Sequence, residues 1–223
     1  MKRKAYDGVY NKFIKRGLDI VITGIALLIL WPLYLILSLV IVLEDGFPVF
    51  YKADRGGYKN KTFQICKFRT MIKNADKVGG GTTALNDPRI TKVGNVLRKT
   101  KLDEIPQLGQ VFIGKMSLIG PRPELVRYTD QYEGEEKDIL NVRPGITDFS
   151  SVEFINLDEI VGGENADEMY EKYVLKKKNQ LRIKYAHEVS FKTDVSILFR
   201  TLGAVLHKSF GFLFRNEHRY SGK

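Results

Sequence analysis

The longest apolar segment of the chain runs from Ile20 to Leu43, 24 residues without a charged side chain. At about 1.5 Å per residue, a straight helix of this length is on the order of 36 Å long, enough to cross the hydrocarbon core of a membrane. A cleaved signal peptide has a shorter apolar centre and small residues at its cleavage site, whereas this segment ends in Val-Leu-Glu-Asp-Gly-Phe-Pro. The pattern therefore predicts a membrane-associated helix near the N-terminus.

Pro32 follows Trp31 and divides this segment almost in half. Proline removes one backbone donor and clashes with the carbonyl four residues earlier, so we expect a bend there. A kinked helix that crosses the bilayer is favoured by the routine tolerance of proline in transmembrane helices. A helix-break-helix hairpin that enters and leaves by one face is favoured by lysine and arginine at both ends, since these residues prefer the cytoplasmic side. The residues alone leave both arrangements open.

After the apolar segment, polar and apolar positions alternate as in a soluble domain. Thr62 to Thr70 reads as a strand, with Phe63, Ile65, Lys67 and Arg69 on one face. Two cations after two apolar residues predict a strand that leaves the core and ends at a polar site. A strand tip exposed to water is the alternative.

Glycine and proline mark the connections of this body. The Gly79-Gly80-Gly81 triplet predicts a flexible loop over 73–88, followed by a helix from Thr91 to Thr100 and another from near Leu102. Pro106 fits the first turn of that second helix. Two later segments, Gly120-Pro-Arg-Pro and Val142-Arg-Pro-Gly, predict rigid turns that present Arg122 and Arg143.

Two helices are predicted in the last third of the chain. Ala166 to Tyr185 has a loose apolar stripe, with Asp167 as a candidate cap, and Asp194 is a candidate cap for the last helix. Aromatic residues and leucine alternate with basic residues towards the end of that helix, as is typical of a helix at a membrane interface. Ordinary packing against the body is the alternative.

Composition narrows the class of protein. The 223 residues are 43% hydrophobic and 28% charged, which predicts one compact domain or two small ones. One cysteine, Cys66, excludes an intrachain disulfide, and with three histidines it gives no zinc-binding cluster. The net charge of +10 indicates an acidic partner, such as nucleic acid, anionic lipid or a phosphorylated substrate.

Asp103 and Glu104 are adjacent carboxylates in a strongly basic neighbourhood that includes Arg98 and Arg122. By themselves they are explained by favourable charge at the start of a helix. Successive helical residues point about 100° apart, so the pair also suits two roles at one site. A carboxylate nucleophile beside a second carboxylate and a divalent ion is a workable arrangement for phosphoryl chemistry.

Five segments, in order and at consistent spacing, resemble motifs of the bacterial sugar transferases, small monotopic phosphoglycosyltransferases that act on polyprenyl phosphate. The resemblance runs from about Lys12 to Lys208. The segments are Lys15-Arg-Gly-Leu-Asp with Pro32 and Arg55-Gly-Gly, then Lys67-Phe-Arg-Thr-Met, Leu102-Asp-Glu-Ile-Pro-Gln-Leu, Met116-Ser-Leu-Ile-Gly-Pro-Arg-Pro-Glu and Val142-Arg-Pro-Gly-Ile-Thr.

The resemblance implies a reaction. Such enzymes move a sugar-1-phosphate from a UDP-sugar to undecaprenyl phosphate and release UMP, using Mg²⁺ and a phosphosugar-aspartate intermediate. Carried onto this chain, Asp103 is the nucleophile and Glu104 its partner in metal or proton handling, so both are expected at the metal. The cations expected to bind substrate phosphates are Lys67, Arg69, Arg98, Arg122 and Arg143, since guanidinium groups suit phosphate oxygens.

The resemblance also implies an architecture, α+β and mainly helical. Residues 1–50 would form a re-entrant membrane helix broken at Trp31-Pro32. Residues 51–223 would form a compact catalytic domain with a short β element and interfacial amphipathic helices, on the cytoplasmic face of the bacterial inner membrane. Trp31 stands where many relatives have serine, and Asp148-Phe-Ser-Ser stands where many have Gly-Trp-Ala-Gln.

The partners expected are a UDP-sugar, undecaprenyl phosphate and membrane lipid, and not nucleic acid. Homo-oligomerisation, the sugar and the glycan pathway are left open. The competing hypothesis is a membrane-tethered basic module that binds nucleic acid or anionic lipid. Nucleic-acid binders rarely place carboxylates within a phosphate site, which favours the enzyme.

Overall fold

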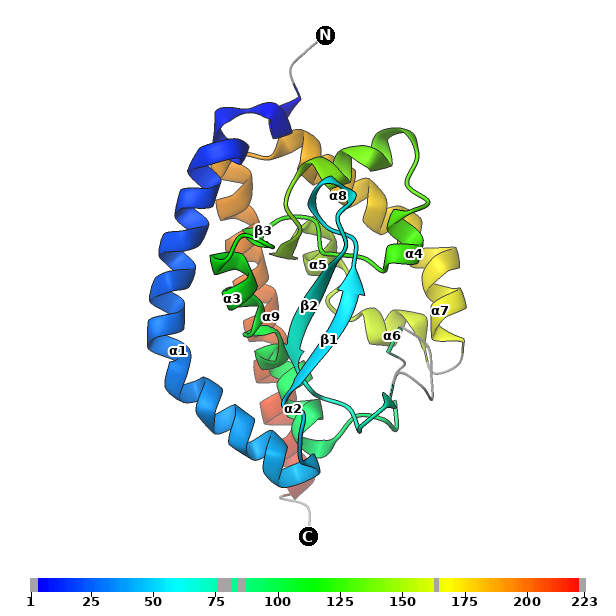
Figure 1. Cartoon of the computed structure of the whole chain (residues 1–223). Coiled ribbons are helices and arrows are strands. Elements are labelled where there is room, and N and C mark those ends of the chain that lie inside the picture. The colour runs from blue at the N-terminus through cyan, green and yellow to red at the C-terminus, as the bar shows by residue number, and fades with distance from the viewer. Residues whose placement is uncertain (1–3, 76–81, 84–86, 163–164, 221–223) are drawn as a thin grey trace.

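The computed structural model describes residues 4–75, 82–83, 87–162 and 165–220, with side chains up to residue 211. Helices dominate, and the described residues contain two small two-stranded sheets (Figure 1). The predicted mainly helical α+β class is therefore confirmed. The Gly79-Gly80-Gly81 triplet of the predicted loop lies outside the described residues.

The apolar segment forms α1, Lys15–Asp45, preceded by the short helices η1, Ala5–Asp7, and η2, Tyr10–Ile14. α1 continues through Pro32 without interruption, and its axis bends part-way along its length (Figure 1). The expected bend is present, but the expected break of the helix at Trp31-Pro32 is not. A single proline removes one hydrogen bond from the ladder, and the turns on either side carry the helix past it.

α1 lies along the side of the body and is held to it near its N-terminal end by polar side chains. The Lys15 ammonium forms an ion pair with Asp194 of the last helix, and Asp19 Oδ1 accepts a 3.0 Å hydrogen bond from Leu118 N. Arg16 donates to the carbonyl oxygens of residues 111 and 112. At the other end, Asp45 pairs with Arg69. Both ends of α1 are thus fixed to the same body.

The remaining face of α1 is apolar and exposed. One helix in the described residues, Tyr10–Asp45, is long and apolar enough to cross a membrane. Only about a tenth of its most apolar window is buried inside the protein. Side chains exposed over more than half of their surface include Val21, Ile25, Leu28, Ile29, Trp31, Leu35, Ile36, Leu39 and Leu43. An apolar surface of this extent is typical of contact with lipid.

The first sheet is an antiparallel hairpin of β1, Phe50–Arg55, and β2, Phe63–Phe68, joined through the short helix η3, Tyr58–Asn60. The strand predicted over 62–70 is confirmed. Phe68, at the end of β2, is buried with Ile41 of α1 and Leu97 of the following helix. The hairpin is thereby packed against α1.

The segment that carries the two adjacent carboxylates follows. α2, Lys92–Thr100, begins at Thr91, whose hydroxyl caps it by accepting a 2.9 Å hydrogen bond from Gly94 N. It ends at Lys101, whose positive φ of 61° reverses the chain into the short helix η5, Leu102–Glu104. α3, Gln107–Phe112, starts after Pro106 and packs against α1. Both predicted helices are therefore present, the second opening with a 3₁₀ turn.

The second sheet joins the two proline-arginine turns. β3, Ser117–Ile119, and β4, Gly145–Thr147, run parallel, with Ser117 opposite Gly145. A Cβ on Gly145 would lie 2.1 Å from Gly120 N, so only glycine allows this approach. The pairing places Arg122 and Arg143 on neighbouring stretches of chain, each directly beside a short strand.

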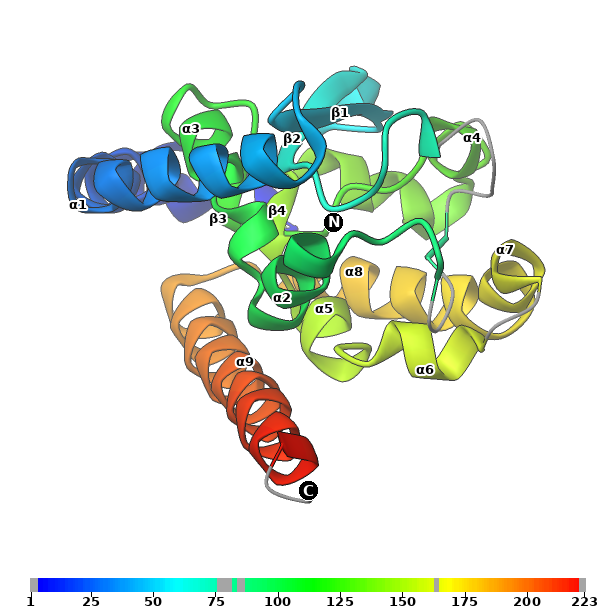
Figure 2. The same cartoon turned by 90° about the horizontal axis from the view of Figure 1, so that it is seen from below.

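Helices complete the body (Figures 1 and 2). They are α4, Val126–Thr129; η6, Gly134–Asn141; α5, Phe149–Glu153; α6, Leu157–Val161; α7, Ala166–Met169; η7, Tyr170–Leu175; α8, Lys176–Glu188; and α9, Phe191–Tyr220. The helix predicted over 166–185 is confirmed as the continuous run from α7 to α8.

Two predicted caps are wrong. Asp167 lies inside α7, where its carboxylate accepts a 2.7 Å hydrogen bond from Thr82 N. Asp194 lies within the first turn of α9 and receives hydrogen bonds from Tyr10 and Tyr185. Both carboxylates instead accept hydrogen bonds from residues that are distant in the sequence, and the local sequence does not predict these contacts.

Candidate active site

A cavity of about 820 Å³ opens in the body between the hairpin, α2, η5, the turn after β3, and helices α5, α6, η7, α8 and α9. Asp103 and Glu104 line it, as do Lys67, Arg98 and Arg122. Five of the predicted site residues thus come from four different segments, β2, α2, η5 and the turn after β3. The cavity is the place where the sequence motifs converge.

Glu104 is held between two cations. Arg122 Nη1 donates a 2.9 Å hydrogen bond to Glu104 Oε2, and Arg122 Nη2 donates to Oε1. Lys67 Nζ donates to the same Oε1 at 3.0 Å. The Glu104 carboxylate is therefore fixed by a bidentate guanidinium and an ammonium.

Asp103 is buried beside this cluster and makes far fewer polar contacts than Glu104. It is 5% exposed, and Lys67 Nζ lies 4.0 Å from its Oδ2. Its Oδ1 is buried and has no hydrogen-bond partner among the described residues. A buried carboxylate oxygen without a partner is costly, so its retention indicates a ligand or a reaction at that atom.

The two carboxyl groups have pKa values shifted in opposite directions. Burial raises the pKa of Asp103, and the neighbouring Glu104 charge adds to this, against the attraction of Lys67. Burial also acts to raise the pKa of Glu104, but Arg122 and Lys67 outweigh it and hold that pKa well below its usual range. Such a divergence within one pair is a mark of a functional site.

Arg122 is positioned by β4 and by the residue that follows this strand, Asp148. Its backbone N donates a 3.2 Å hydrogen bond to Asp148 Oδ2, and its Nη1 also donates to the Ile146 carbonyl oxygen at 2.8 Å. Asp148 is fully buried, caps α5 through Ser151 N, and accepts hydrogen bonds from the Ser150 and Ser151 hydroxyls. The departure from the usual motif at 148–151 therefore holds the cation that binds Glu104.

Not every predicted cation reaches the cavity. Arg98 lines it, and its nearest hydrogen-bond partner is Thr70 Oγ1 at 3.5 Å. Arg69 instead pairs with Asp45 at the end of α1, while its backbone N donates a 2.9 Å hydrogen bond to Val49 O beside the hairpin. Arg143 stacks over the Tyr58 ring, 5.3 Å from its centroid. Arg69 and Arg143 do not line the cavity, and the binding of substrate by these two residues stays a prediction.

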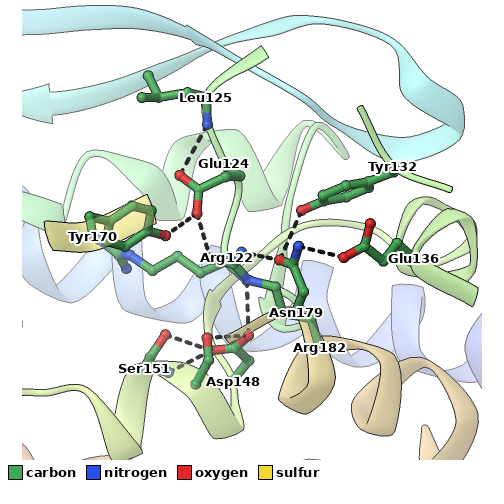
Figure 3. Close-up of polar contacts among 11 residues, drawn as sticks. Arg122, Glu124, Leu125, Tyr132, Glu136, Asp148, Ser151, Tyr170, Asn179 and Arg182 are labelled. Atoms are coloured by element: carbon green, nitrogen blue, oxygen red, sulfur yellow. Dashed lines mark hydrogen bonds and ion pairs between the residues drawn. The ribbon is translucent and has the colours of Figure 1, made fainter. Parts of the chain in front are cut away.

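A second polar network, around Glu124, also lines the cavity (Figure 3). Glu124 Oε2 accepts hydrogen bonds from the Tyr170 hydroxyl at 2.5 Å and from Arg182 Nη2 at 2.9 Å. Arg182 is almost fully buried, and its Nη1 donates to Asn179 Oδ1 at 3.0 Å. Burial acts to raise the pKa of Glu124, but Arg182 and Lys178 outweigh it and lower that pKa.

The sequence pattern did not predict this network. Glu124 is the last residue of the motif that begins at Met116, and nothing else in the sequence indicates a role for it. Lys178 and Arg182 lie one helical turn apart on α8, within a run of basic residues that reads as a solvated helix surface. Their burial depends on the packing of α8 against the turn after β3.

The side chains around Asp103 decide whether the site can hold the expected Mg²⁺. Among the described residues there is no group of three or more histidine, cysteine or acidic side chains that could hold a metal ion. Mg²⁺, however, keeps several waters and is held by one or two carboxylates together with substrate phosphates. The unpartnered Asp103 Oδ1, next to Glu104, fits that kind of site.

Comparison with known proteins agrees with this geometry. Residues 10–208 match the family described as bacterial sugar transferase. The chain belongs to the bacterial sugar transferase family. The match includes α1, the hairpin, the carboxylate pair of η5, both proline-arginine turns and most of α9.

Individual members of the family are similar over most of this chain. It is 36% identical over 203 residues to the UDP-N-acetylgalactosamine-undecaprenyl-phosphate N-acetylgalactosaminephosphotransferase of Aeromonas hydrophila, covering 87% of this chain and 44% of that protein. It is 35% identical over 196 residues to the UDP-glucose:undecaprenyl-phosphate glucose-1-phosphate transferase of Escherichia coli (strain K12), covering 86% and 40%. The chain thus spans less than half the length of these two relatives.

A shorter family member is similar over nearly its full length. The exopolysaccharide production protein ExoY of Sinorhizobium fredii is 34% identical over 206 residues, which cover 86% of this chain and 84% of that protein. The region shared with the longer sugar transferases is therefore also found as most of a compact family member.

Proposed function

We propose that this protein transfers a sugar-1-phosphate from a UDP-sugar to undecaprenyl phosphate and releases UMP, in an early membrane step of surface glycan synthesis. The observation that carries the proposal is the unpartnered Oδ1 of Asp103, buried in a basic cavity beside a fully engaged Glu104. The names of the relatives support the same type of substrate.

Asp103 is the nucleophile of this proposal. Its carboxylate oxygen forms a bond to the phosphorus that carries the sugar, while the bond from that phosphorus to the bridging oxygen breaks. The bridging oxygen leaves with both electrons as part of UMP, and a phosphosugar-aspartate remains. The lipid phosphate then attacks the same phosphorus and frees Asp103. Splitting the transfer into two displacements is the usual advantage of covalent catalysis.

The surrounding cations make attack by an anion on an anion feasible. Lys67 and Arg122 hold Glu104 and present their remaining donors to the cavity, and Arg98 lines it without a carboxylate partner in the described part of the chain. Fixed positive groups stabilise the charge on the transferred phosphoryl oxygens. Glu104 fixes Lys67 and Arg122, and both of its carboxylate oxygens therefore accept hydrogen bonds from these two cations.

Mg²⁺ is part of the proposal. Asp103 would hold the ion through its unpartnered Oδ1, and Glu104 through Oε2, which accepts one hydrogen bond and has a second lone pair, together with the donor diphosphate. The ion would neutralise part of the phosphate charge, in addition to the part that the protein cations neutralise.

We further propose that residues 1–50 enter and leave the membrane by its cytoplasmic face in a bacterial inner membrane, with the catalytic body of residues 51–223 on that face. Both ends of α1 are fixed to one body, through Lys15–Asp194 and Asp45–Arg69, while its apolar face is exposed. Exposed Phe199 and Leu206 on α9 supply a second lipid-facing surface. The lipid phosphate would then reach a cavity that lies beside the membrane.

Trapping the intermediate tests the reaction. Wild-type protein incubated with UDP-sugar and Mg²⁺ but no lipid should release UMP and gain one sugar-phosphate mass on the peptide that contains Asp103. Asp103→Asn should do neither, while Asp130→Asn, a change at an exposed aspartate, should behave as wild type. Release of UMP only after lipid is added, without an adduct, would instead show a single displacement. A panel of UDP-sugars identifies the donor.

A further inference from the structure

Lys178 is a buried amine that the chemistry above does not use. The residue is 7% exposed, yet it lines the cavity. Its Nζ makes no hydrogen bond or ion pair with any residue that the structure describes, and it lies 5.0 Å from the ring centroid of Tyr170 and 5.9 Å from that of Phe154. The aromatic faces hold the ammonium at the wall, with its donors still free.

The carboxylates near Lys178 are committed elsewhere. Glu124 Oε2 accepts from Tyr170 and Arg182, and Asp148 accepts from the backbone of Arg122 and from two serines. Burial, reinforced by repulsion from Arg182 and Arg122, outweighs the attraction of Glu124 and Asp148 and lowers the pKa of Lys178 to about 7. A buried ammonium whose neighbouring carboxylates are already hydrogen-bonded to other groups favours the binding of an anion from outside the chain.

The position of Lys178 in the fold indicates which anion this ammonium binds. It lies in the first turn of α8, directly after α7 and η7, and α7 lies on the opposite side of the body from α1 in both Figure 1 and Figure 2. Asp103 and Glu104 instead lie on the turn before α3, which packs against α1. In the membrane arrangement proposed above, a lipid phosphate approaches from the side of α1, so the part of the cavity beside Lys178 is left to the soluble donor.

Resting on the function proposed above, we propose that Lys178 binds the nucleotide-side phosphate of the donor, the one that leaves with UMP. When the bond from the attacked phosphorus to the bridging oxygen breaks, that oxygen remains on UMP with its electron pair and its negative charge grows. The ammonium donates hydrogen bonds to this phosphate and keeps its proton. Arg122, fixed by Glu104, serves the phosphate that is attacked, so the two phosphates of the donor have separate cations.

Binding of UDP to the full chain in detergent, at fixed Mg²⁺ concentration, tests the proposal. Lys178→Met keeps an apolar side chain of similar length over Tyr170 and should raise the Kd for UDP roughly tenfold or more, since a hydrogen bond to a charged group is lost. Lys178→Arg should restore part of the affinity. Lys176→Met, an exposed lysine of the same helix, is the matched control and should bind UDP as wild type does.

Two further measurements separate the donor phosphate from the lipid phosphate. The KM for UDP-sugar should rise in Lys178→Met together with the Kd for UDP, while the KM for undecaprenyl phosphate stays within about twofold of wild type. The Kd of wild type for UDP should also rise between pH 7 and pH 8.5 as the ammonium is lost, and Lys178→Met should remove most of this dependence.

The outcomes distinguish failure of this site from failure of the proposed function. An unchanged Kd for UDP in a folded Lys178→Met, or a rise confined to the KM for the lipid, overturns the assignment while the transfer reaction stands. Weaker binding of UDP in Lys178→Met, combined with a wild type that releases no UMP from any UDP-sugar, overturns the reaction while the phosphate site stands. A wild type that does not bind UDP at all overturns both.

Discussion

The Tyr34 hydroxyl of α1 donates a 2.6 Å hydrogen bond to the carbonyl oxygen of Ile105, the residue that follows Glu104. Tyr34 lies two residues after Pro32, just beyond the middle of the apolar segment. It also packs against Phe68 at the end of β2, with ring centroids 5.5 Å apart. The membrane-associated helix is therefore bonded directly to the turn that carries the two carboxylates.

Tyr34→Phe should lower turnover several-fold without changing membrane association. The ring and its packing remain, whereas one hydrogen bond worth about 1 kcal/mol is lost from the turn that positions Asp103 and Glu104. Initial rates at saturating donor and lipid measure the effect. Ser38→Ala removes a hydroxyl that bonds only within α1, to Tyr34 O, and serves as the control. Equal rates for Tyr34→Phe and wild type would show that this bond does not position the carboxylates.

Asp103→Asn and Glu104→Gln should have opposite effects on stability, although both impair turnover. Asp103 has a raised pKa and an unpartnered buried oxygen, so removing its charge should leave the melting temperature unchanged or higher. Glu104→Gln removes the anion between Lys67 and Arg122 and should cost about 2 kcal/mol, or roughly 5 °C in Tm. Thermal unfolding in detergent compares the two. A lower Tm for Asp103→Asn would contradict the view that its charge opposes folding.

Arg122→Lys should be impaired nearly as severely as Arg122→Met. Lysine keeps the charge but cannot reach Glu104 Oε1 and Oε2 and the Ile146 carbonyl at once, as the guanidinium does. We expect turnover at least tenfold below wild type for both variants, with Arg127→Lys, at a more exposed arginine, as the control. Near-normal turnover by Arg122→Lys would show that charge alone suffices at this position.

Tags at the N-terminus and after Lys223 should both be protected in intact cells and become labelled only when the inner membrane is permeabilised. The reason is the attachment of both ends of α1 to one body, by Lys15–Asp194 and Asp45–Arg69. A protein with a known external tag controls for labelling. Labelling of one end alone from outside would establish a crossing helix and exclude the re-entrant arrangement.

Acid should weaken the attachment of the N-terminal segment at Asp138. Burial acts to raise the pKa of Asp138, but hydrogen bonds from Lys4, His187 and Tyr6 outweigh it and lower that pKa to about 2. Since the folded value lies below the ordinary value of 3.8, the stabilisation is complete above about pH 4 and disappears as the pH falls towards 2. Asp138→Asn should thus unfold at a lower temperature than wild type at pH 7, with the gap narrowing below pH 4. A gap that stays constant down to pH 2.5 would count against this contribution.

The elements and the motif order were predictable because they depend on neighbours along the chain. The apolar run of α1, the alternation of β2, the start of α2 at Thr91 and the proline turns around Arg122 and Arg143 all have local causes. The pairing of Asp103 with Glu104 and the nearness of Lys67 and Arg122 were expected from a resemblance between ordered motifs, and the structure brings these four together.

Other outcomes were decided by tertiary structure alone. Arg69 pairs with Asp45 of α1 and does not line the cavity, and Asp194 became the partner of Lys15, a contact between residues far apart in the chain. Lys178 and Lys176 are alike in sequence, yet one lines the cavity and the other faces solvent, because α8 turns only one of them towards Tyr170. Local sequence determines which conformation each segment prefers. Burial and charge partners are set by distant segments, so only the folded chain decides which cation is neutralised and which is left to bind a phosphate.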